Sequence, residues 1–184
     1  MAHSTLHPNR DVWFTSDTHF GHENIIHYAG RPFEDAAEMD EALIEAWNAR
    51  VKPEDLVWHL GDFAMPNGAA KAARKRLNGT IRLIVGNHDN IPRLAHAGLF
   101  QAIRESYSLG ALDPRLDGVV ATHRPIVLGD TSRVNVHGHI HHRPTDSPRH
   151  VNVCVEATGY APIHFEELLA RVEAARAGSE GATP

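Results

Sequence analysis

The segment VWFTSDTHFGH, residues 12–22, runs from hydrophobic residues directly into a carboxylate and two imidazoles. Residues 11–16 are rich in β-branched and aromatic side chains and predict a strand. Asp17 and His19 follow the end of that strand. In an extended chain, residues two positions apart direct their side chains to the same side. Whether they form a site depends on whether other strands of the chain end in similar residues.

Four further hydrophobic runs end in polar clusters of the same kind. Strands are predicted over 55–60, 80–85, 117–122 and 133–137, and the clusters that follow them are GDF (61–63), GNHD (86–89), THRP (122–125) and GHIH (138–141). Asp, His and Asn side chains are ligands of borderline divalent metals. The glycines before Asp62, Asn87 and His139 permit tight turns at these points. Because open α/β sheets bind ligands at the carboxyl ends of their strands, the clusters predict one site there.

Each cluster taken alone has an ordinary structural explanation. A lone histidine such as His59 is more often a surface or core residue than a metal ligand, and a Gly-Asp pair usually marks a turn. Five such clusters at strand ends are different, because repelling carboxylates and partly buried imidazoles at one sheet edge would be costly without a cation. We therefore interpret the set as a metal site.

The order of the blocks D-x-H, G-D, G-N-H-D, H and G-H-x-H, from Asp17 to His141, resembles the calcineurin-like metallophosphoesterases. The surrounding text SDTHFGHENII, RPF, WN and VWHLGDF is similar to a small bacterial and phage-type branch of that family without a cap domain. The resemblance is specific, because five separate blocks occur in the family's order. It implies an α/β fold, a four-layer αββα sandwich of two mixed β-sheets with a dimetal site at one sheet edge.

The resemblance also implies two divalent metal ions per chain. Seven residues at matching positions are expected to bind them: Asp17, His19 and His141 for the first metal, Asn87, His123 and His139 for the second, and Asp62 as a bridge between both. Manganese is the first expectation, and iron, zinc or nickel are alternatives that such a ligand set accepts. His88 matches a position that is not a ligand in the family, so it is the expected catalytic imidazole.

Three further residues are candidates for substrate binding. His22 opens a predicted helix and is expected to face the substrate or support a ligand, with packing at the helix start as the alternative. Arg31 and Arg124 are candidates because a guanidinium suits phosphate oxygens, and ordinary surface positions are the alternative for both. Asp89 is a weaker candidate for orienting His88.

The expected reaction is hydrolysis of a phosphoester by a hydroxide generated from water that bridges the two metals. His88 would donate a proton to the leaving alkoxide or bind a phosphate oxygen. Diesters are favoured, because small capless members that the chain resembles often act on them. The alternative is a phosphomonoesterase acting on a nucleotide or a small phosphometabolite. A binding scaffold that lost the chemistry is disfavoured, because all seven ligand positions and His88 are present.

Composition bounds the remaining properties. The 184 residues predict a single domain over 1–178 and a disordered tail over 179–184. The net charge of −5 argues against general nucleic-acid binding and against binding to anionic membranes, so the expected partner is a small phosphoester, with a nucleotide as one candidate. We expect a cytoplasmic protein, since no secretory signal or membrane span is visible and Cys154 is the single cysteine.

The remaining elements follow from hydrophobic periodicity and helix-end signals. Helices are predicted over 22–29, 34–51, 68–77, 91–98 and 165–178, the last ending at Gly178, and one more strand is predicted over 150–156. Residues 101–116 are ambiguous, with two strands around the turn LDPR as the expectation.

Overall fold

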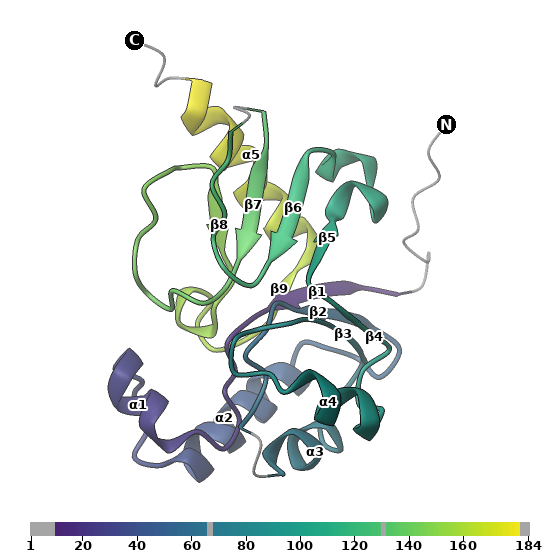
Figure 1. Ribbon diagram of the computed structural model, residues 1–184, viewed down its shortest axis with the longest axis vertical. Helices are drawn as coiled ribbons and strands as arrows, with labels where there is room; N and C mark the ends of the chain where they lie inside the picture. The colour runs from purple at the N-terminus through teal and green to yellow at the C-terminus, as the bar shows by residue number, and fades with distance from the viewer. Residues whose placement is uncertain (1–9, 66–67, 130–131, 181–184) are drawn as a thin grey trace.

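The computed structural model describes residues 10–65, 68–129 and 132–180, and in them two β-sheets lie against each other (Figure 1). The first sheet has the strand order β4-β3-β2-β1-β9, with β1 (Val12–Thr15), β2 (Leu56–His59), β3 (Thr80–Ile84), β4 (Ala102–Arg104) and β9 (Ile163–His164). Its first four strands are parallel, and β9 pairs antiparallel with β1. The parallel strands therefore all end at the same edge.

The second sheet has the order β5-β6-β7-β8, with β5 (Ser106–Ser108), β6 (Val119–Thr122), β7 (Val134–His137) and β8 (His150–Asn152). The strands β6, β7 and β8 are parallel, and β5 is antiparallel to β6. Both sheets are thus mixed, which confirms the predicted α/β fold class.

Within the described ranges, five α-helices surround the sheets. The helices α1 (Glu23–Ala29), α2 (Ala36–Asn48), α3 (Ala69–Arg74) and α4 (Ile91–Ala97) lie below the first sheet in Figure 1, while α5 (Phe165–Glu180) lies beside the second. Side chains cap two of them, since Asp35 accepts the N–H of Glu38 and Asn90 accepts the N–H of Arg93. Among the described residues, no helix combines the length and the hydrophobicity needed to cross a bilayer.

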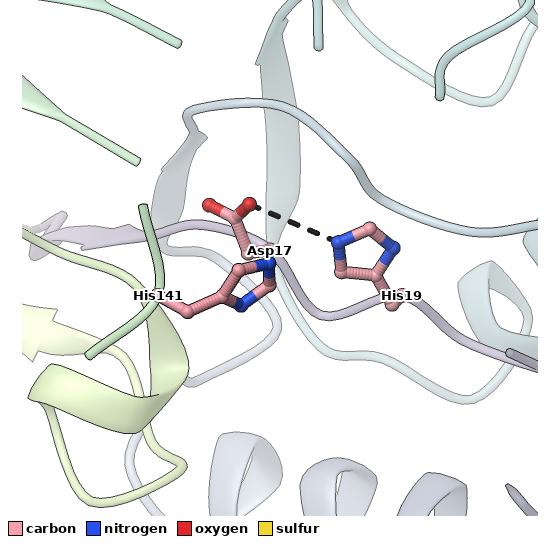
Figure 2. Close-up of side chains that lie close together, drawn as sticks. All are labelled: Asp17, His19 and His141. Carbon is pink, nitrogen blue, oxygen red and sulfur yellow. Dashed lines mark ion pairs between the residues drawn. The ribbon is translucent and has the colours of Figure 1, made fainter. Parts of the chain in front are cut away.

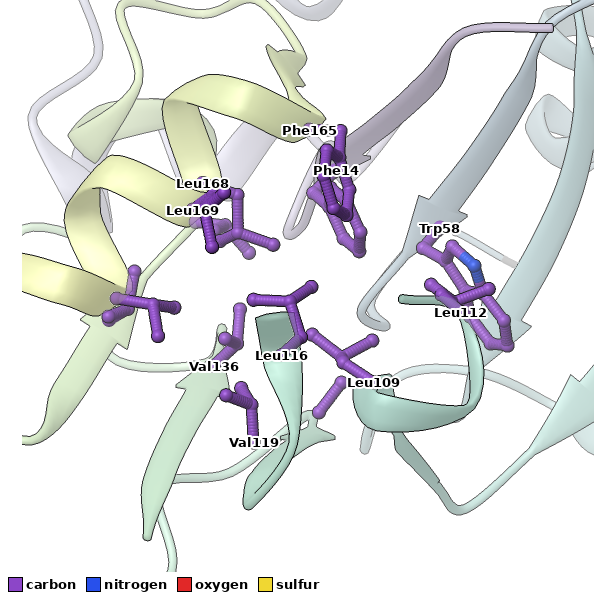
Figure 3. Packing of buried hydrophobic residues seen from close by; sticks show 14 of the residues in the cluster. Phe14, Trp58, Leu109, Leu112, Leu116, Val119, Val136, Phe165, Leu168 and Leu169 are labelled. Atoms are coloured by element: carbon purple, nitrogen blue, oxygen red, sulfur yellow. The ribbon is translucent and has the colours of Figure 1, made fainter. Parts of the chain in front are cut away.

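One hydrophobic cluster joins the two sheets and α5 (Figure 3). Alternation along β1 turns Val12 and Phe14 into this cluster and Trp13 to the opposite face. Trp58 of β2, Val136 of β7 and helix α5 complete its walls. Burial of each large apolar side chain stabilises the fold by about 1.5–3 kcal/mol, so the two strand edges that carry the polar clusters are held in fixed relation.

A second cluster lies between the first sheet and the helices below it. Its sheet side includes Val57 and Leu83, and its helix side includes Met39, Leu43 and Trp47 from α2, all of them buried. The helical spacing of the α2 residues is the pattern that predicted this helix. The first sheet is therefore covered on both faces, as its continuous hydrophobic strands require.

The structure corrects the prediction for residues 101–116. The strands β4 and β5 both precede the LDPR turn, and the turn itself lies among two short 3-10 helices, Leu109–Ala111 and Pro114–Leu116. Asp113 accepts the backbone N–H of Arg115, and Pro114 stands at the first helical position, where its fixed φ is favourable. Local capping therefore replaces the second expected strand.

Two predicted boundaries are also wrong. The strand expected over 150–156 ends at Asn152, and a 3-10 helix follows at Val155–Ala157. Helix α5 continues through Gly178 to Glu180, so the tail predicted over 179–184 begins too early. Glycine permits a helix to end but does not force it to. Residues 1–9 and 181–184 of the predicted domain and tail lie outside the described residues.

Candidate metal centre

Both groups of expected metal ligands come together where β1, β2, β3, β6 and β7 end. The atoms that can bind a metal lie within 4.8 Å of one another in Asp17, His19 and His141, and equally in Asp62, His123 and His139. Asn87 joins the second group, because its Oδ1 lies 3.0 Å from Nε2 of His123. The structure thus brings all seven positions into two adjacent groups.

The first group contains two buried polar atoms that lack a partner. Asp17 and His19 are fully buried, and Oδ1 of Asp17 lies 3.8 Å from Nε2 of His19 (Figure 2). Neither atom has a hydrogen-bond partner among the described residues. Leaving buried polar atoms unpaired is costly, and a cation between them removes that cost. The donor set therefore fits a divalent metal.

The other carboxylate oxygen of Asp17 is fully engaged. Oδ2 accepts hydrogen bonds from the hydroxyl of Ser16 at 2.5 Å, the N–H of His139 at 2.9 Å and the thiol of Cys154 at 3.3 Å. Burial by itself raises the pKa of Asp17, but His19, His123 and Ser16 outweigh it and hold that pKa below its usual range. Asp17 is therefore a carboxylate with one oxygen fixed by the protein and one turned into the site.

Asp62 lies between the two groups. Its Oδ2 is 3.6 Å from Nε2 of His19 in the first group and 3.4 Å from Nε2 of His123 in the second. Its Oδ1 accepts the backbone N–H of His88 at 2.8 Å. Burial raises the pKa of Asp62, but His123 in particular outweighs this and keeps the pKa below its usual range. This position supports the bridging role expected of it.

Three of the four imidazoles are anchored through Nδ1. His123 Nδ1 donates to the carbonyl of Leu60 at 2.8 Å, and His141 Nδ1 donates to Glu156 at 2.8 Å. His19 Nδ1 contacts Nδ1 of His22 at 3.3 Å. A partner on one ring nitrogen fixes the orientation of the ring and leaves the other nitrogen for a metal. In all three rings the nitrogen left is Nε2.

The backbone of the metal centre is unusual. Among the described residues, six non-glycine residues have positive φ, and five of them are expected ligands: Asp17, His19, Asp62, His139 and His141. Left-handed backbone costs a residue with a side chain about 1–2 kcal/mol. The expectation that Asp17 and His19 present their side chains along extended chain is therefore wrong. Strain of this kind concentrates at functional sites, where the surroundings hold it.

All three glycines in these turns serve close approach, since a Cβ on Gly61 would collide with the backbone of Gly86. A Cβ on Gly86 would collide with the backbone nitrogen and carboxylate of Asp62, and a Cβ on Gly138 would collide with Ser16 and the carboxylate of Asp17. Only the third, Gly61, has positive φ, at 100°. The sequence therefore identifies the correct glycine positions, but glycine is needed there mainly because a side chain would collide with the neighbouring turn.

Asp89 does not orient His88. Its carboxylate accepts the backbone N–H groups of Asp62 at 2.9 Å, Phe63 at 3.0 Å and Gly86 at 2.8 Å. It therefore ties the turn after β2 to the turn after β3 and fixes Asp62 relative to Asn87.

The expectation that Arg31 faces a substrate phosphate is corrected. The Arg31 side chain is fully buried behind the first group, where it donates to the carbonyls of Asp17 and Thr18 and pairs with Glu156 at 2.7 Å. Glu156 in turn holds His141. Arg31 thus supports the ligand segment from behind, and none of its nitrogens is left for a phosphate.

Glu156 is the residue that the sequence interpretation missed. It is 5% exposed at its side chain, and one oxygen, Oε1, accepts from both Arg31 and His141. Burial raises its pKa, but His141 and Arg31 favour the charged form and keep the pKa below its usual range. One signal was available, because Glu156 ends the predicted strand 150–156 just as the ligands end the other strands.

Replacing Glu156 with Gln is expected to weaken binding at the Asp17, His19 and His141 group by about 10- to 100-fold, the usual effect of losing a residue that orients a metal ligand. The second group keeps its affinity, so metal titration separates two classes of site. Glu166→Gln is the matched control, since Glu166 lies in an exposed ion pair with Arg115. Unchanged affinity of both sites in Glu156→Gln contradicts the positioning role.

An open cleft of about 600 Å³ lies over ligands of both groups, and two of the remaining candidates line it. His22 and His88 line it, with ring centroids 5.8 Å apart, and both lie close to the ring of His19. The Arg124 guanidinium is at the second group, 3.0 Å from Nε2 of His139 and 3.2 Å from Oδ1 of Asn87. These three side chains are therefore placed where a substrate over the ligands would meet them.

His59 is a satisfied core histidine. It is completely buried, its Nδ1 accepts the N–H of Gly61, and its Nε2 lies 3.0 Å from the hydroxyl of Thr18, which donates to the carbonyl of Phe63. Burial lowers its pKa to about 3, so it stays neutral and fixes the turns on either side of it.

Comparisons with known proteins agree with this geometry. A family model described as calcineurin-like phosphoesterase matches residues 11–171. An uncharacterized protein from Methanocaldococcus jannaschii is 33% identical over 179 residues, covering 89% of this chain and 92% of that protein. The gene 66 protein of Mycobacterium phage D29 is 32% identical, covering 80% of this chain and 88% of its own. A solved structure, a protein of unknown function from Aquifex aeolicus, is 25% identical with a TM-score of 0.66, covering 87% of this chain and 98% of that one.

Proposed function

The chain belongs to the calcineurin-like phosphoesterase family, and from this premise we propose that it is a phosphodiesterase that uses two divalent metal ions. Hydrolysis of a phosphoester follows from family membership. The choice of diesters, the residues that act and the metal are the proposal. Manganese is the first candidate metal, because a mixed set of imidazole, carboxylate and amide ligands accepts it.

The observation that supports the proposal best is the state of Asp17 and His19. Both are buried, both have left-handed backbone, and each turns a polar atom without a described partner into the same space. The strained backbone and the unpaired buried atoms of Asp17 and His19 cost stability, and a cation that binds between them stabilises the folded state.

The ligand residues have distinct tasks. Metal ions bound at the two groups would supply positive charge to phosphoryl oxygens and lower the pKa of a bound water. Asp62, between His19 and His123, keeps the groups in register, and Asp89 holds Asp62 through backbone hydrogen bonds. The buried, anchored imidazoles need little rearrangement when they bind, which is the advantage of preorganised ligands.

His88 is the proton donor of the proposal. Its backbone is fixed by Asp62, its ring packs at 72° against His19, and its side chain lines the open cleft. A positioned imidazole can give its proton to a leaving oxygen. His22 supports His19 from Nδ1 and lines the same cleft, so it is proposed to contact the substrate as well.

The shape of the site favours diesters. The cleft of about 600 Å³ is open above the ligands, and its lining includes Tyr28, a residue that is 76% exposed. A substrate can therefore extend on both sides of the phosphorus. The second candidate is a monoester, which the exposed Arg124 guanidinium would favour by neutralising the additional charge of its phosphate.

A direct comparison of substrates tests the proposal. Protein reconstituted with manganese is expected to hydrolyse bis(para-nitrophenyl) phosphate with higher kcat/KM than para-nitrophenyl phosphate, and metal removal by a chelator should abolish both activities. Replacing Arg124 with Met should lower the monoester rate more than the diester rate, because the monoester carries the greater charge. A wild-type preference for the monoester would establish the second candidate instead.

A further inference from the structure

A second cavity, of about 500 Å³, adjoins the metal cleft on the far side of His88. It lies among α3, α4 and the segment after β2, and its walls include Ala64, Met65, Ala70, Leu94 and Leu99. His88 lines both this cavity and the cleft above the metal ligands, so the two spaces meet at the proposed proton donor.

The walls of the cavity are mainly apolar. Ala64, Ala70 and Leu94 are buried and belong to the cluster beneath the first sheet, while Met65 and Leu99 are partly exposed toward the cavity. Pockets of this volume with apolar walls and few polar groups are typical of small-molecule sites, so the cavity has room for a group with an aromatic ring. A flexible methionine in such a wall can adapt to its shape.

The charged side chains around this second cavity are all positive among the described residues. Lys71 and Arg93 line the cavity, and no carboxylate does so among the described residues. Lys71 belongs to the basic run of Lys71, Arg74, Lys75 and Arg76. Both guanidinium groups of this run are engaged, since Arg74 donates to the carbonyls of Leu77 and Gly79 and Arg76 pairs with Glu41. In the part of the chain that the structure describes, the Lys71 ammonium makes no ion pair, so it is available to an anion.

We propose that this cavity binds the leaving group of the substrate, an alcohol with an aromatic body and an acidic substituent. The inference rests on the proposed function, because it takes His88 as the residue that protonates the leaving oxygen. The group attached to that oxygen must lie next to His88, and the cavity is the apolar space that adjoins His88 beside the metal cleft. The retained half of the diester then stays in the metal cleft, whose lining includes Tyr28.

The reaction balances as ordinary hydrolysis. The bond from phosphorus to the leaving oxygen breaks, and that oxygen keeps the electron pair and takes the proton of His88. The oxygen of water forms the new bond to phosphorus. One proton of the water restores His88, and the other stays on the phosphate product or passes to solvent.

Two methyl phosphodiesters that differ only in the leaving group test the charge. In one the leaving group is para-hydroxybenzoate, and in the other it is the neutral para-hydroxybenzamide. The metal-loaded wild type is expected to prefer the carboxylate ester by about two- to fivefold in kcat/KM, the range of a solvent-exposed ion pair. Lys71→Met should bring the ratio close to one, while Lys75→Met, a neighbouring cation outside the cavity wall, should leave it unchanged.

A second variant tests the space. Ala97 is exposed at the end of α4 and lines the cavity, so Ala97→Trp fills part of it without disturbing a buried position. The KM for both esters is expected to rise about tenfold, as loss of well-packed aryl contacts can cause. Inhibition by inorganic phosphate, which needs only the metal cleft, should not change.

The outcomes separate this proposal from the one on which it rests. Hydrolysis of both esters with equal kcat/KM, or a ratio and KM that neither Lys71→Met nor Ala97→Trp changes, overturns the leaving-group cavity and leaves the diesterase intact. If neither ester is hydrolysed, the diesterase proposal fails. Equilibrium binding then decides on the cavity: preference for para-hydroxybenzoate over para-hydroxybenzamide that is lost in Lys71→Met supports it, and no preference overturns it.

Discussion

Replacing Asp62 with Asn is expected to remove metal from both groups of ligands and to reduce hydrolysis by far more than the loss of any single terminal ligand. Oδ2 of Asp62 lies within 3.6 Å of His19 in one group and 3.4 Å of His123 in the other, so one substitution weakens both. Asn keeps the shape and an oxygen that can accept the N–H of His88, so the turn itself is retained. The loss should exceed the roughly 10- to 100-fold effect of removing a supporting residue.

Thermal stability should fall together with activity. A ligand that binds only the folded state stabilises it by about 2.7 kcal/mol at 100 times its dissociation constant, and Asp62→Asn forfeits this at both sites. Elemental analysis, turnover and thermal unfolding with and without manganese measure the three effects. Asp17→Asn is the control, because the oxygen that Asp17 turns into the site faces the first group, while its contact with the second group is the backbone N–H of His139, so this variant should retain one metal. Near-wild-type turnover with two bound metals in Asp62→Asn would show that the bridge is assigned to the wrong residue.

Replacing His88 with Ala is expected to lower the rate by about 10²- to 10⁴-fold while both metals stay bound. The His88 side chain is exposed to the cleft, and it touches the first group only through ring contact with His19. Its removal therefore takes away a proton donor without removing a ligand. Metal content measured on the same preparation distinguishes this residue from the seven ligands.

The loss in His88→Ala should depend on the leaving group. A nitrophenolate needs little protonation and should show a small deficit, whereas an alkyl or ribose leaving group should show a large one. Equal deficits for both would favour binding of a phosphate oxygen over proton donation. A preparation that has lost one metal would make His88 a ligand.

Sequence reasoning succeeded where the determining interactions are local. The hydrophobic runs that became these strands (β1, β2, β3, β6 and β7) are short and mainly buried, and each is followed directly by its ligand cluster. Because parallel strands end at the same edge of their sheet, the clusters after β1, β2 and β3 meet in the first sheet, and those after β6 and β7 meet in the second. The position of the site thus followed from the strand pattern and from the order of the ligand blocks.

The backbone at the ligands could not be predicted in this way. A spacing of two residues suggested extended chain, yet Asp17 and His19 are left-handed. Their backbone N–H groups donate to the carbonyls of Gly61 and Asp62, 44 and 43 residues further along the chain. The conformation is therefore imposed by a neighbouring turn and leaves no trace in the local sequence.

The supporting network was hidden for the same reason. Arg31 and Glu156 are 125 residues apart, and only the folded chain shows that they hold His141 together. Asp89 resembled a partner for the adjacent His88, but its actual partners are backbone groups on two turns. Buried polar residues of this kind are defined by what they contact, which a single sequence does not state.

The number of metal ions bound per chain tests the central claim most directly. Elemental analysis of protein saturated with manganese, after removal of excess metal, is expected to approach two ions per chain, one for each group of ligands. Asp17→Asn and His139→Ala should each reduce the number of bound ions toward one, because Asp17 belongs to the first group of ligands and His139 to the second. A wild-type value that saturates at one ion per chain would contradict the two-metal site, however active the protein proved to be.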